Sequence, residues 1–251
     1  MPAFNGSTPI SGQLSMPVTG SKYGFSATRL SRLGSAEYTL VTIAADISGS
    51  VYGFIRAIEK CISEIVRAAA GSPRADSLML RVVAFDHKLT EIHGFKPLME
   101  CAPDRYKRAL SAGGSTALYD ASHNAVGAMT GYGKMLTDHD FDVNALLFVI
   151  TDGADNASVQ TARGVGVALS EAVTGEKVES MLSVLVGVNV KNKNISKYLM
   201  DFSATAGFTQ YVELKKADAA TLGRLADFAS RSIAVQSAAL GTSAPSQPLT
   251  F

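Results

Sequence analysis

Apolar residues along this chain occur in two alternating kinds of run. The first kind is short, nearly continuous and rich in Val, Ile and Leu, at residues 38–45, 78–85, 143–151 and 180–188. Such runs are typical of strands that are buried on both faces of a parallel sheet. The second kind repeats apolar residues every three or four positions, which indicates amphipathic helices at about 51–70, 117–129, 157–173, 194–206 and 219–236. This alternation predicts an α/β domain with a mostly parallel sheet.

Three shorter segments complete the predicted order of elements. A turn at 86–88 is followed by an apolar segment at 89–93, which we expect to return as a short antiparallel strand. Residues 103–110 begin with proline and predict a short helix. Residues 209–212 predict a short edge strand close to the end of the sheet.

The chain of 251 residues, 47% of them hydrophobic, is long enough for one large domain with its own core, which we place at residues 37–237. Residues 1–36 are rich in Gly, Ser, Thr and Pro and predict a flexible or extended N-terminal arm. The later half of this arm carries Tyr23, Phe25, Leu30 and Leu33, which are apolar enough to dock on a surface. Residues 238–251 predict a loose C-terminal tail.

Charge and cysteine content favour a soluble cytoplasmic protein. The formal net charge is +1, so no strong field would attract nucleic acid or an anionic membrane, and we expect neither as a partner. Cys61 and Cys101 are far apart and are expected to be buried thiols in a reducing compartment. The chain has no apolar run long enough to span a membrane, and its first residues do not resemble a signal peptide.

The end of the first predicted strand carries the most distinctive chemistry. Asp46, Ser48 and Ser50 place an oxygen at every second residue, so in extended backbone the three side chains point the same way. One carboxylate and two hydroxyls form a hard oxygen set of the kind that suits Mg²⁺ or Mn²⁺. The alternative is a serine-rich turn in which Asp46 caps the following helix.

Two further loops carry oxygen-bearing residues. One is the glycine-rich loop 113–116, which ends in Thr116, and the other is the acidic loop 152–156, which begins with Asp152 directly after a buried strand. In α/β domains with a mostly parallel sheet, ligands bind beyond the carboxyl ends of the strands. We therefore expect the loops 46–50, 113–116 and 152–156 to converge on one metal site.

These three motifs together resemble the metal-ion-dependent adhesion site (MIDAS) of von Willebrand factor A (vWA) domains. The residues that carry the resemblance are DISGS from Asp46, GGSTALYDA with Thr116, and FVITDGADN with Asp152, and the likeness covers about residues 38–235. It implies a single, doubly wound domain, with helices on both faces of the sheet and one antiparallel edge strand. It also implies that five residues hold Mg²⁺, or Mn²⁺ in its place, directly or through water: Asp46, Ser48, Ser50, Thr116 and Asp152.

The resemblance implies a non-enzymatic adaptor or scaffold. In such a module the metal keeps one open position, which takes an Asp, a Glu or a terminal carboxylate of a partner protein. Intracellular bacterial-type members of the family work beside an AAA+ ATPase or in stress-resistance systems. The expected cofactor is therefore Mg²⁺ and the expected partner is a protein.

Two alternative functions remain open from the residues. A metal-dependent hydrolase or phosphotransfer enzyme could use the same site, with Asp86, His87 or Asp155 as its general base. A self-assembling structural protein could associate through its arm or tail, with a terminal carboxylate of one chain on the metal of the next.

Several neighbouring residues have simpler interpretations. Ser115 would replace Thr116 if the loop shifted by one residue. Asp120, Asp155 and Asn156 are expected to cap helices or to carry surface charge, and Asp86 to form a turn. The segment 131–135 lacks the first glycine and the hydroxyl residue of a phosphate-binding loop, and we interpret it as a glycine-capped helix end.

Overall fold

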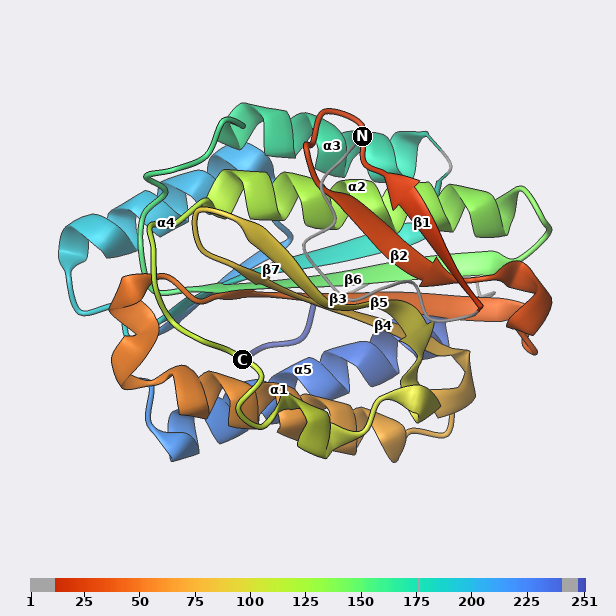
Figure 1. Ribbon diagram of the computed structural model, residues 1–251, viewed down its shortest axis with the longest axis horizontal. Coiled ribbons are helices and arrows are strands. Elements are labelled where there is room, and N and C mark those ends of the chain that lie inside the picture. Colours follow the sequence, from red (N-terminus) through yellow and green to blue (C-terminus); the bar gives the residue numbers. More distant parts are fainter. Residues whose placement is uncertain (1–11, 176, 241–247) are drawn as a thin grey trace.

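The computed structural model describes residues 12–175, 177–240 and 248–251. They form one eight-stranded sheet between two layers of helices, with the strand order β1-β2-β5-β4-β3-β6-β7-β8 (Figure 1). The strands are β1 Gln13–Pro17, β2 Gly24–Thr28, β3 Glu37–Asp46, β4 Leu78–Phe85, β5 Leu89–Pro97, β6 Asp142–Thr151, β7 Ser180–Val188 and β8 Gln210–Leu214.

In the part of the chain that the structure describes, five helices cover the two faces of the sheet. Helices α1 and α5 lie on one face, and α2, α3 and α4 lie on the other (Figure 1). Their bounds are α1 Ile55–Ala70, α2 Leu118–Thr137, α3 Ala162–Thr174, α4 Lys193–Ala206 and α5 Ala219–Ala239. This doubly wound, mostly parallel architecture confirms the predicted fold class.

The four central strands are buried on both faces, as their continuous apolar runs predicted. Every residue of β4 is buried, and in β3 only the first residue, Glu37, is partly exposed. Strands β4, β3, β6, β7 and β8 run parallel to one another. Their carboxyl ends therefore meet at one edge of the molecule, where ligands of such sheets bind.

The predicted antiparallel strand is present as β5 and is longer than expected. It pairs with β4 in the antiparallel direction, and on its other side it pairs with β2 in the parallel direction. The β1–β2 hairpin therefore extends the sheet beyond β5.

The expected N-terminal arm docks on its own domain over the part that the structure describes, residues 12–36. Phe25 and Ala27 of β2 are fully buried, and the Phe25 ring packs edge-on against Phe95 at 6.2 Å between centroids. The Tyr132 hydroxyl donates to the Thr28 carbonyl at 2.8 Å. Burial of these apolar groups accounts for the docking. Residues 1–11 lie outside the described part of the chain.

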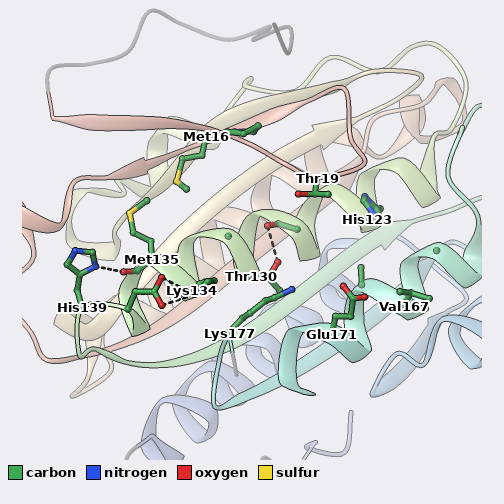
Figure 2. Close-up of a pocket in the computed structure, with 16 residues that line it drawn as sticks. Met16, Thr19, His123, Thr130, Lys134, Met135, His139, Val167, Glu171 and Lys177 are labelled. Atoms are coloured by element: carbon green, nitrogen blue, oxygen red, sulfur yellow. Dashed lines mark hydrogen bonds and ion pairs between the residues drawn. The ribbon is translucent and has the colours of Figure 1, made fainter. Parts of the chain in front are cut away.

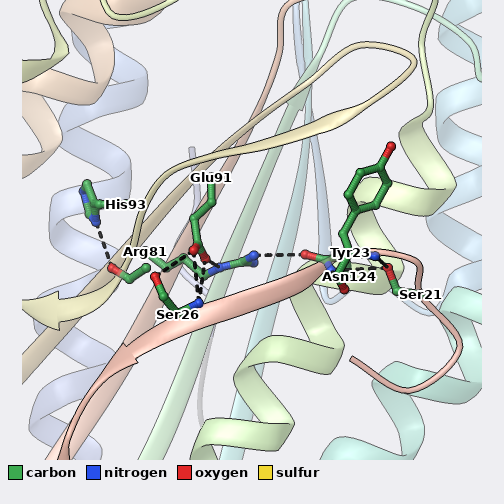
Figure 3. A network of polar contacts seen from close by, with 8 residues as sticks. Ser21, Tyr23, Ser26, Arg81, Glu91, His93 and Asn124 are labelled. Atoms are coloured by element: carbon green, nitrogen blue, oxygen red, sulfur yellow. Dashed lines mark hydrogen bonds and ion pairs between the residues drawn. The ribbon is translucent and has the colours of Figure 1, made fainter. Parts of the chain in front are cut away.

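A buried polar network fastens this hairpin to the sheet (Figure 3). The Arg81 side chain, which is 1% exposed, donates from Nε to Glu91 at 2.7 Å and from Nη2 to the Asn124 amide oxygen at 3.0 Å. Glu91 also accepts from the backbone N–H and the hydroxyl of Ser26 in β2. Gly94 permits this approach, because a Cβ there would lie 2.0 Å from the Ser26 carbonyl oxygen. The network joins β2, β4, β5 and α2.

Two local predictions were wrong in extent. The helix expected over 103–110 is a single 3₁₀ turn at Pro103–Tyr106. The glycine-capped helix end expected at 131–135 lies inside α2, which continues to Thr137. Gly133 serves close packing there, since a Cβ would lie 2.7 Å from the carbonyl oxygen of Lys177.

The C-terminal tail is helical at first, because α5 continues to Ala239. Residues 241–247 of the expected loose tail lie outside the described residues. Beyond them, Leu249 packs against the core, and the Phe251 ring lies edge-on to Phe228 of α5, with 5.5 Å between centroids. The last residues therefore contact their own domain.

Candidate metal centre

Asp46 is the last residue of β3 and is fully buried. Its Oδ1 accepts from the Ser48 backbone N–H at 2.7 Å, and its Oδ2 accepts from the Thr151 hydroxyl at 2.6 Å. Asp46 does not cap the following helix, because a 3₁₀ turn at Gly49–Gly53 intervenes and α1 begins at Ile55. The carboxylate is held in a fixed orientation at the edge of the sheet, and the helix-cap alternative is wrong.

A chain of oxygen atoms links the first loop to the third. The Ser48 and Ser50 hydroxyls lie 3.1 Å apart, and the Ser50 hydroxyl donates to Oδ1 of Asp152 at 2.7 Å. Residues 46 and 152 are 106 positions apart, and the parallel pairing of β3 with β6 places them side by side. The structure therefore brings Asp46, Ser48, Ser50 and Asp152 together, as predicted from their positions after the two strands.

Backbone hydrogen bonds attach the glycine-rich loop to the first loop. Gly113 N–H donates to the Ile47 carbonyl at 2.8 Å, and Gly49 N–H donates to the Gly114 carbonyl at 3.0 Å. Gly114 has φ +77° and lies under His87, whose Nδ1 would be 2.5 Å from an added Cβ. A residue with a side chain would strain both the backbone and this contact.

Thr116 is attached to the third loop. Its backbone N–H donates to the Asn156 side-chain oxygen at 2.7 Å, and its carbonyl accepts from Asn156 N–H at 2.9 Å. Thr116 is 4% exposed, whereas the alternative hydroxyl residue, Ser115, is exposed. The three loops thus form a closed ring of contacts, and Thr116, not Ser115, is the buried hydroxyl residue of the glycine-rich loop.

The other acidic candidates organise the loops. Asp155 accepts from the Tyr119 backbone N–H at 3.1 Å and from the Ser158 hydroxyl. Asp120 accepts from the backbone N–H groups of Val159 and Gln160. Asp155 thus caps the first turn of α2, as predicted, whereas Asp120 lies inside α2 and binds the third loop ahead of α3, so the helix cap or surface charge expected of Asp120 is wrong.

Asp86 forms the turn between β4 and β5. Its Oδ1 accepts from the Lys88 backbone N–H at 2.7 Å and lies 3.2 Å from the His87 ring. Its carbonyl accepts from Ala117 N–H at the start of α2. This confirms the predicted role of Asp86 in a turn.

The electrostatics of the site fit a hard divalent cation. Burial raises the pKa of Asp46 to about 6; hydrogen bonds from Thr151 and Ser48 oppose this rise, and the charge of Asp152 adds to it. Burial also raises the pKa of Asp152. Within the described residues, no Lys, Arg or His forms an ion pair with either acid. A buried acid next to a partly buried one, with neutral hydroxyl groups as hydrogen-bond partners, gains most from an added cation.

The donors available are oxygens. In the part of the chain that the structure describes, no group of three or more His, Cys, Asp or Glu is arranged to hold a metal. A metal at this site would therefore take hydroxyl oxygens beside the two carboxylates. This donor set suits Mg²⁺ and Mn²⁺ better than soft metals.

Comparison with known proteins shows the fold. No family model matches the sequence, and no curated protein matches it either. Among solved structures, the PilB minor pilin from Streptococcus sanguinis is similar, with a TM-score of 0.58, 11% identity, and coverage of 82% of this chain and 64% of the pilin. The pilus adhesin SpaC from Lactobacillus rhamnosus GG has a TM-score of 0.57 and 8% identity over 80% of this chain and 31% of the adhesin.

A third similar structure is proximal thread matrix protein 1 from the mussel byssus, with zinc in its MIDAS motif. Its TM-score is 0.50 at 16% identity, and the match covers 80% of this chain and 47% of that protein. This chain thus spans less than two thirds of each of the three proteins. At these identities the likeness shows a vWA-like fold and nothing finer.

A separate groove of about 590 Å³ lies between β1, α2 and α3 and shares no residue with the three loops (Figure 2). Met16, Met135 and Val167 line it together with Lys134 and Lys177. The sequence did not predict this groove, because one of its walls is the β1–β2 hairpin, which was expected to be an arm.

Within the described residues, no helix is long and apolar enough to cross a membrane.

Proposed function

We propose that this chain is a metal-dependent protein-binding module of the vWA family, in which Asp46, Ser48, Ser50, Thr116 and Asp152 hold Mg²⁺. The observation that carries the proposal is a buried acid, Asp46, beside a partly buried one, Asp152; both accept hydrogen bonds from hydroxyls, and neither has a cationic partner among the described residues. A divalent ion would supply the missing charge and would accept all three hydroxyl oxygens.

The partner we propose is a protein that offers an Asp, a Glu or a terminal carboxylate to the metal. Two carboxylates only balance the charge of a divalent ion, so the ion keeps its attraction for a third. The zinc-occupied MIDAS of the mussel protein supports a metal at this position of the fold. Mn²⁺ and Zn²⁺ are therefore worth testing beside Mg²⁺.

A non-enzymatic role forms part of the proposal. The candidate bases Asp86 and Asp155 already accept hydrogen bonds from the backbone of their own turns, which leaves them poorly prepared to take a proton from water. The free, buried thiols Cys61 and Cys101 support a reducing, cytoplasmic location. Work beside an AAA+ ATPase or in a stress-resistance system is the cellular setting that the family resemblance suggests.

The first experiment is thermal unfolding with EDTA or with excess Mg²⁺. A ligand that binds only the native state, and is present at about 100 times its Kd, stabilises the native state by about 2.7 kcal/mol. For a domain of this size the midpoint should rise by about 5–10 °C. We expect this rise in the wild type and not in Asp152→Ala, whereas Asp138→Ala, a matched change of an exposed acid, should respond like the wild type.

Binding of a carboxylate is tested next, with immobilised Asp-containing peptides and their Asn counterparts. The proposal expects binding that needs both Mg²⁺ and the carboxylate and that disappears in Asp152→Ala. If Mg²⁺ raises the unfolding midpoint but the peptides do not bind, the metal has only a structural role. That result would overturn the protein-binding function. Turnover of phosphate esters that is lost in Asp46→Ala would favour the enzymatic alternative.

A further inference from the structure

Four exposed lysines gather at the carboxyl ends of β7 and β8: Lys191, Lys193, Lys215 and Lys216. The segments that follow β7 and β8 and carry these lysines, with Lys193 at the start of α4, are joined directly, because Val190 N–H donates to the Leu214 carbonyl at 3.0 Å. Lys191 and Lys215 are the next residues on either side of this bond. Within the described residues, none of the four lysines forms an ion pair. We refer to these four residues as the lysine cluster.

The lysine cluster lies at the same edge of the sheet as the candidate metal centre. The strand registers place Ala45 beside Ile150, Thr151 beside Gly187, and Gly187 beside Glu213. Asp46 is therefore three strands away from the end of β8, which is about 15 Å at the usual strand spacing. Figure 1 shows the start of α4, which carries Lys193, at the same end of the molecule as the turn after β3.

The acids near the lysine cluster are engaged elsewhere. Glu213 accepts from the hydroxyls of Ser196 and Tyr211. Asp218 caps α5 by accepting from Thr221 N–H, and only Lys216 of the cluster contributes to its lowered pKa. Asp201 pairs with Lys197, one turn into α4. The cluster therefore keeps most of its positive charge in a protein whose formal net charge is only +1.

Helix stability does not explain these lysines. Lys193 is the first residue of α4, and a cation at a helix N-terminus is unfavourable because the helix dipole is positive there. An anionic partner would relieve this repulsion. The cluster consequently fits a binding surface better than a solvated helix end.

We propose that the metal centre and the lysine cluster together bind one acidic protein segment. This inference rests on the proposed function: one carboxylate of the segment occupies the open metal position, and a further group of Asp or Glu contacts the lysines. An extended chain rises by about 3.3 Å per residue, so the two anionic parts would be about four to five residues apart. The large exposed aromatic side chains of the described residues, Tyr52 and Phe251, lie outside the cluster, so stacking with nucleic-acid bases is not supported there.

The test uses the full chain and a labelled peptide, Asp-Gly-Ser-Gly-Ser-Glu-Glu-Glu, with fluorescence anisotropy in Mg²⁺. The variant Lys191→Ser with Lys215→Ser should weaken binding of this peptide by about fivefold to tenfold, since exposed charge pairs contribute modestly. The matched control, Lys60→Ser with Lys107→Ser, removes the same charge from exposed positions elsewhere and should leave the affinity unchanged. Both variants should keep the wild-type midpoint rise with Mg²⁺.

The outcomes separate this inference from the proposed function. A peptide with Ser in place of the three Glu should bind the wild type and the cluster variant equally. Binding that requires Mg²⁺ and Asp152 but does not respond to the cluster variant would overturn the inference and leave the proposed function intact. Three results would overturn the bipartite surface. The peptide would fail to bind, its binding would survive Asp152→Ala, or an equal concentration of oligouridine would displace it.

Discussion

Asp46 and Arg81 are both fully buried charges, and the fold treats them in opposite ways. Arg81 has an anionic partner, Glu91, and a neutral one, Asn124, both from its own chain. Asp46 has only neutral donors, and the charged group that acts on its pKa is a second acid, Asp152. A buried charge is costly unless it is paired. The charge of Arg81 is therefore paired within the chain, with only its buried Nη1 left without a hydrogen-bond partner, whereas we propose that a cation from outside pairs the charge of Asp46.

The strongest test of this comparison removes Arg81, the cation of the buried Arg81–Glu91 pair. Arg81→Met leaves Glu91 without its cation, and loss of one member of a buried pair costs about 3–5 kcal/mol. The free energy of unfolding in urea should fall by this amount with or without Mg²⁺. The double variant Arg81→Met with Glu91→Leu should lose less than the single one. A single variant as stable as the wild type would show that the network does not hold the hairpin.

The acid site should respond to pH in the opposite sense from a paired carboxylate. Because the pKa of Asp46 is raised from 3.8 to about 6, the native state binds a proton more tightly than the unfolded state. The protonated Asp46 carboxyl stabilises the native state below about pH 4, and this stabilisation is lost as the pH rises to about 6. The total loss in the free energy of unfolding is about 3 kcal/mol, since each pKa unit corresponds to about 1.4 kcal/mol. Unfolding in EDTA should show this loss in the wild type and not in Asp46→Asn.

Mg²⁺ provides the control for the pH experiment. The ion binds the deprotonated acid, so it should restore stability at pH 7 and have little effect at pH 4. Asp104 and Asp218 titrate in the other direction, but they are present in both proteins and cancel in the comparison. An equal pH slope for wild type and Asp46→Asn would contradict the assignment of the raised pKa to Asp46.

The smallest expected effect concerns the loop hydroxyl. Thr116→Ala should weaken Mg²⁺ binding by about tenfold, or about 1.4 kcal/mol, because a neutral ligand is lost while both carboxylates remain. Ser115→Ala is the matched control and should bind as the wild type, since Ser115 is exposed. Titration of the unfolding midpoint with Mg²⁺ measures both. If Ser115→Ala weakens Mg²⁺ binding and Thr116→Ala does not, the metal ligand is Ser115 and not Thr116.

The sequence predicted the central sheet well because the necessary signals are local. Continuous apolar runs identify β3, β4, β6 and β7, and residues directly after such strands must lie at the carboxyl edge. The N-terminal hairpin lacked such a signal. Its strands have five residues each, and its attachment depends on contacts such as that of Ser26 with Glu91, 65 positions away.

The sequence by itself thus determined the α/β class with a mostly parallel sheet and the oxygen-bearing residues of the candidate metal centre, and the family resemblance added the doubly wound architecture. Only the tertiary structure decided that residues 12–36 extend the sheet, that Thr116 rather than Ser115 is buried, and that lysines from the segments after β7 and β8 lie together. The physical reason is that periodicity and spacing act over a few residues. Strand pairing and the burial of side chains, by contrast, depend on segments that meet only when the chain has folded.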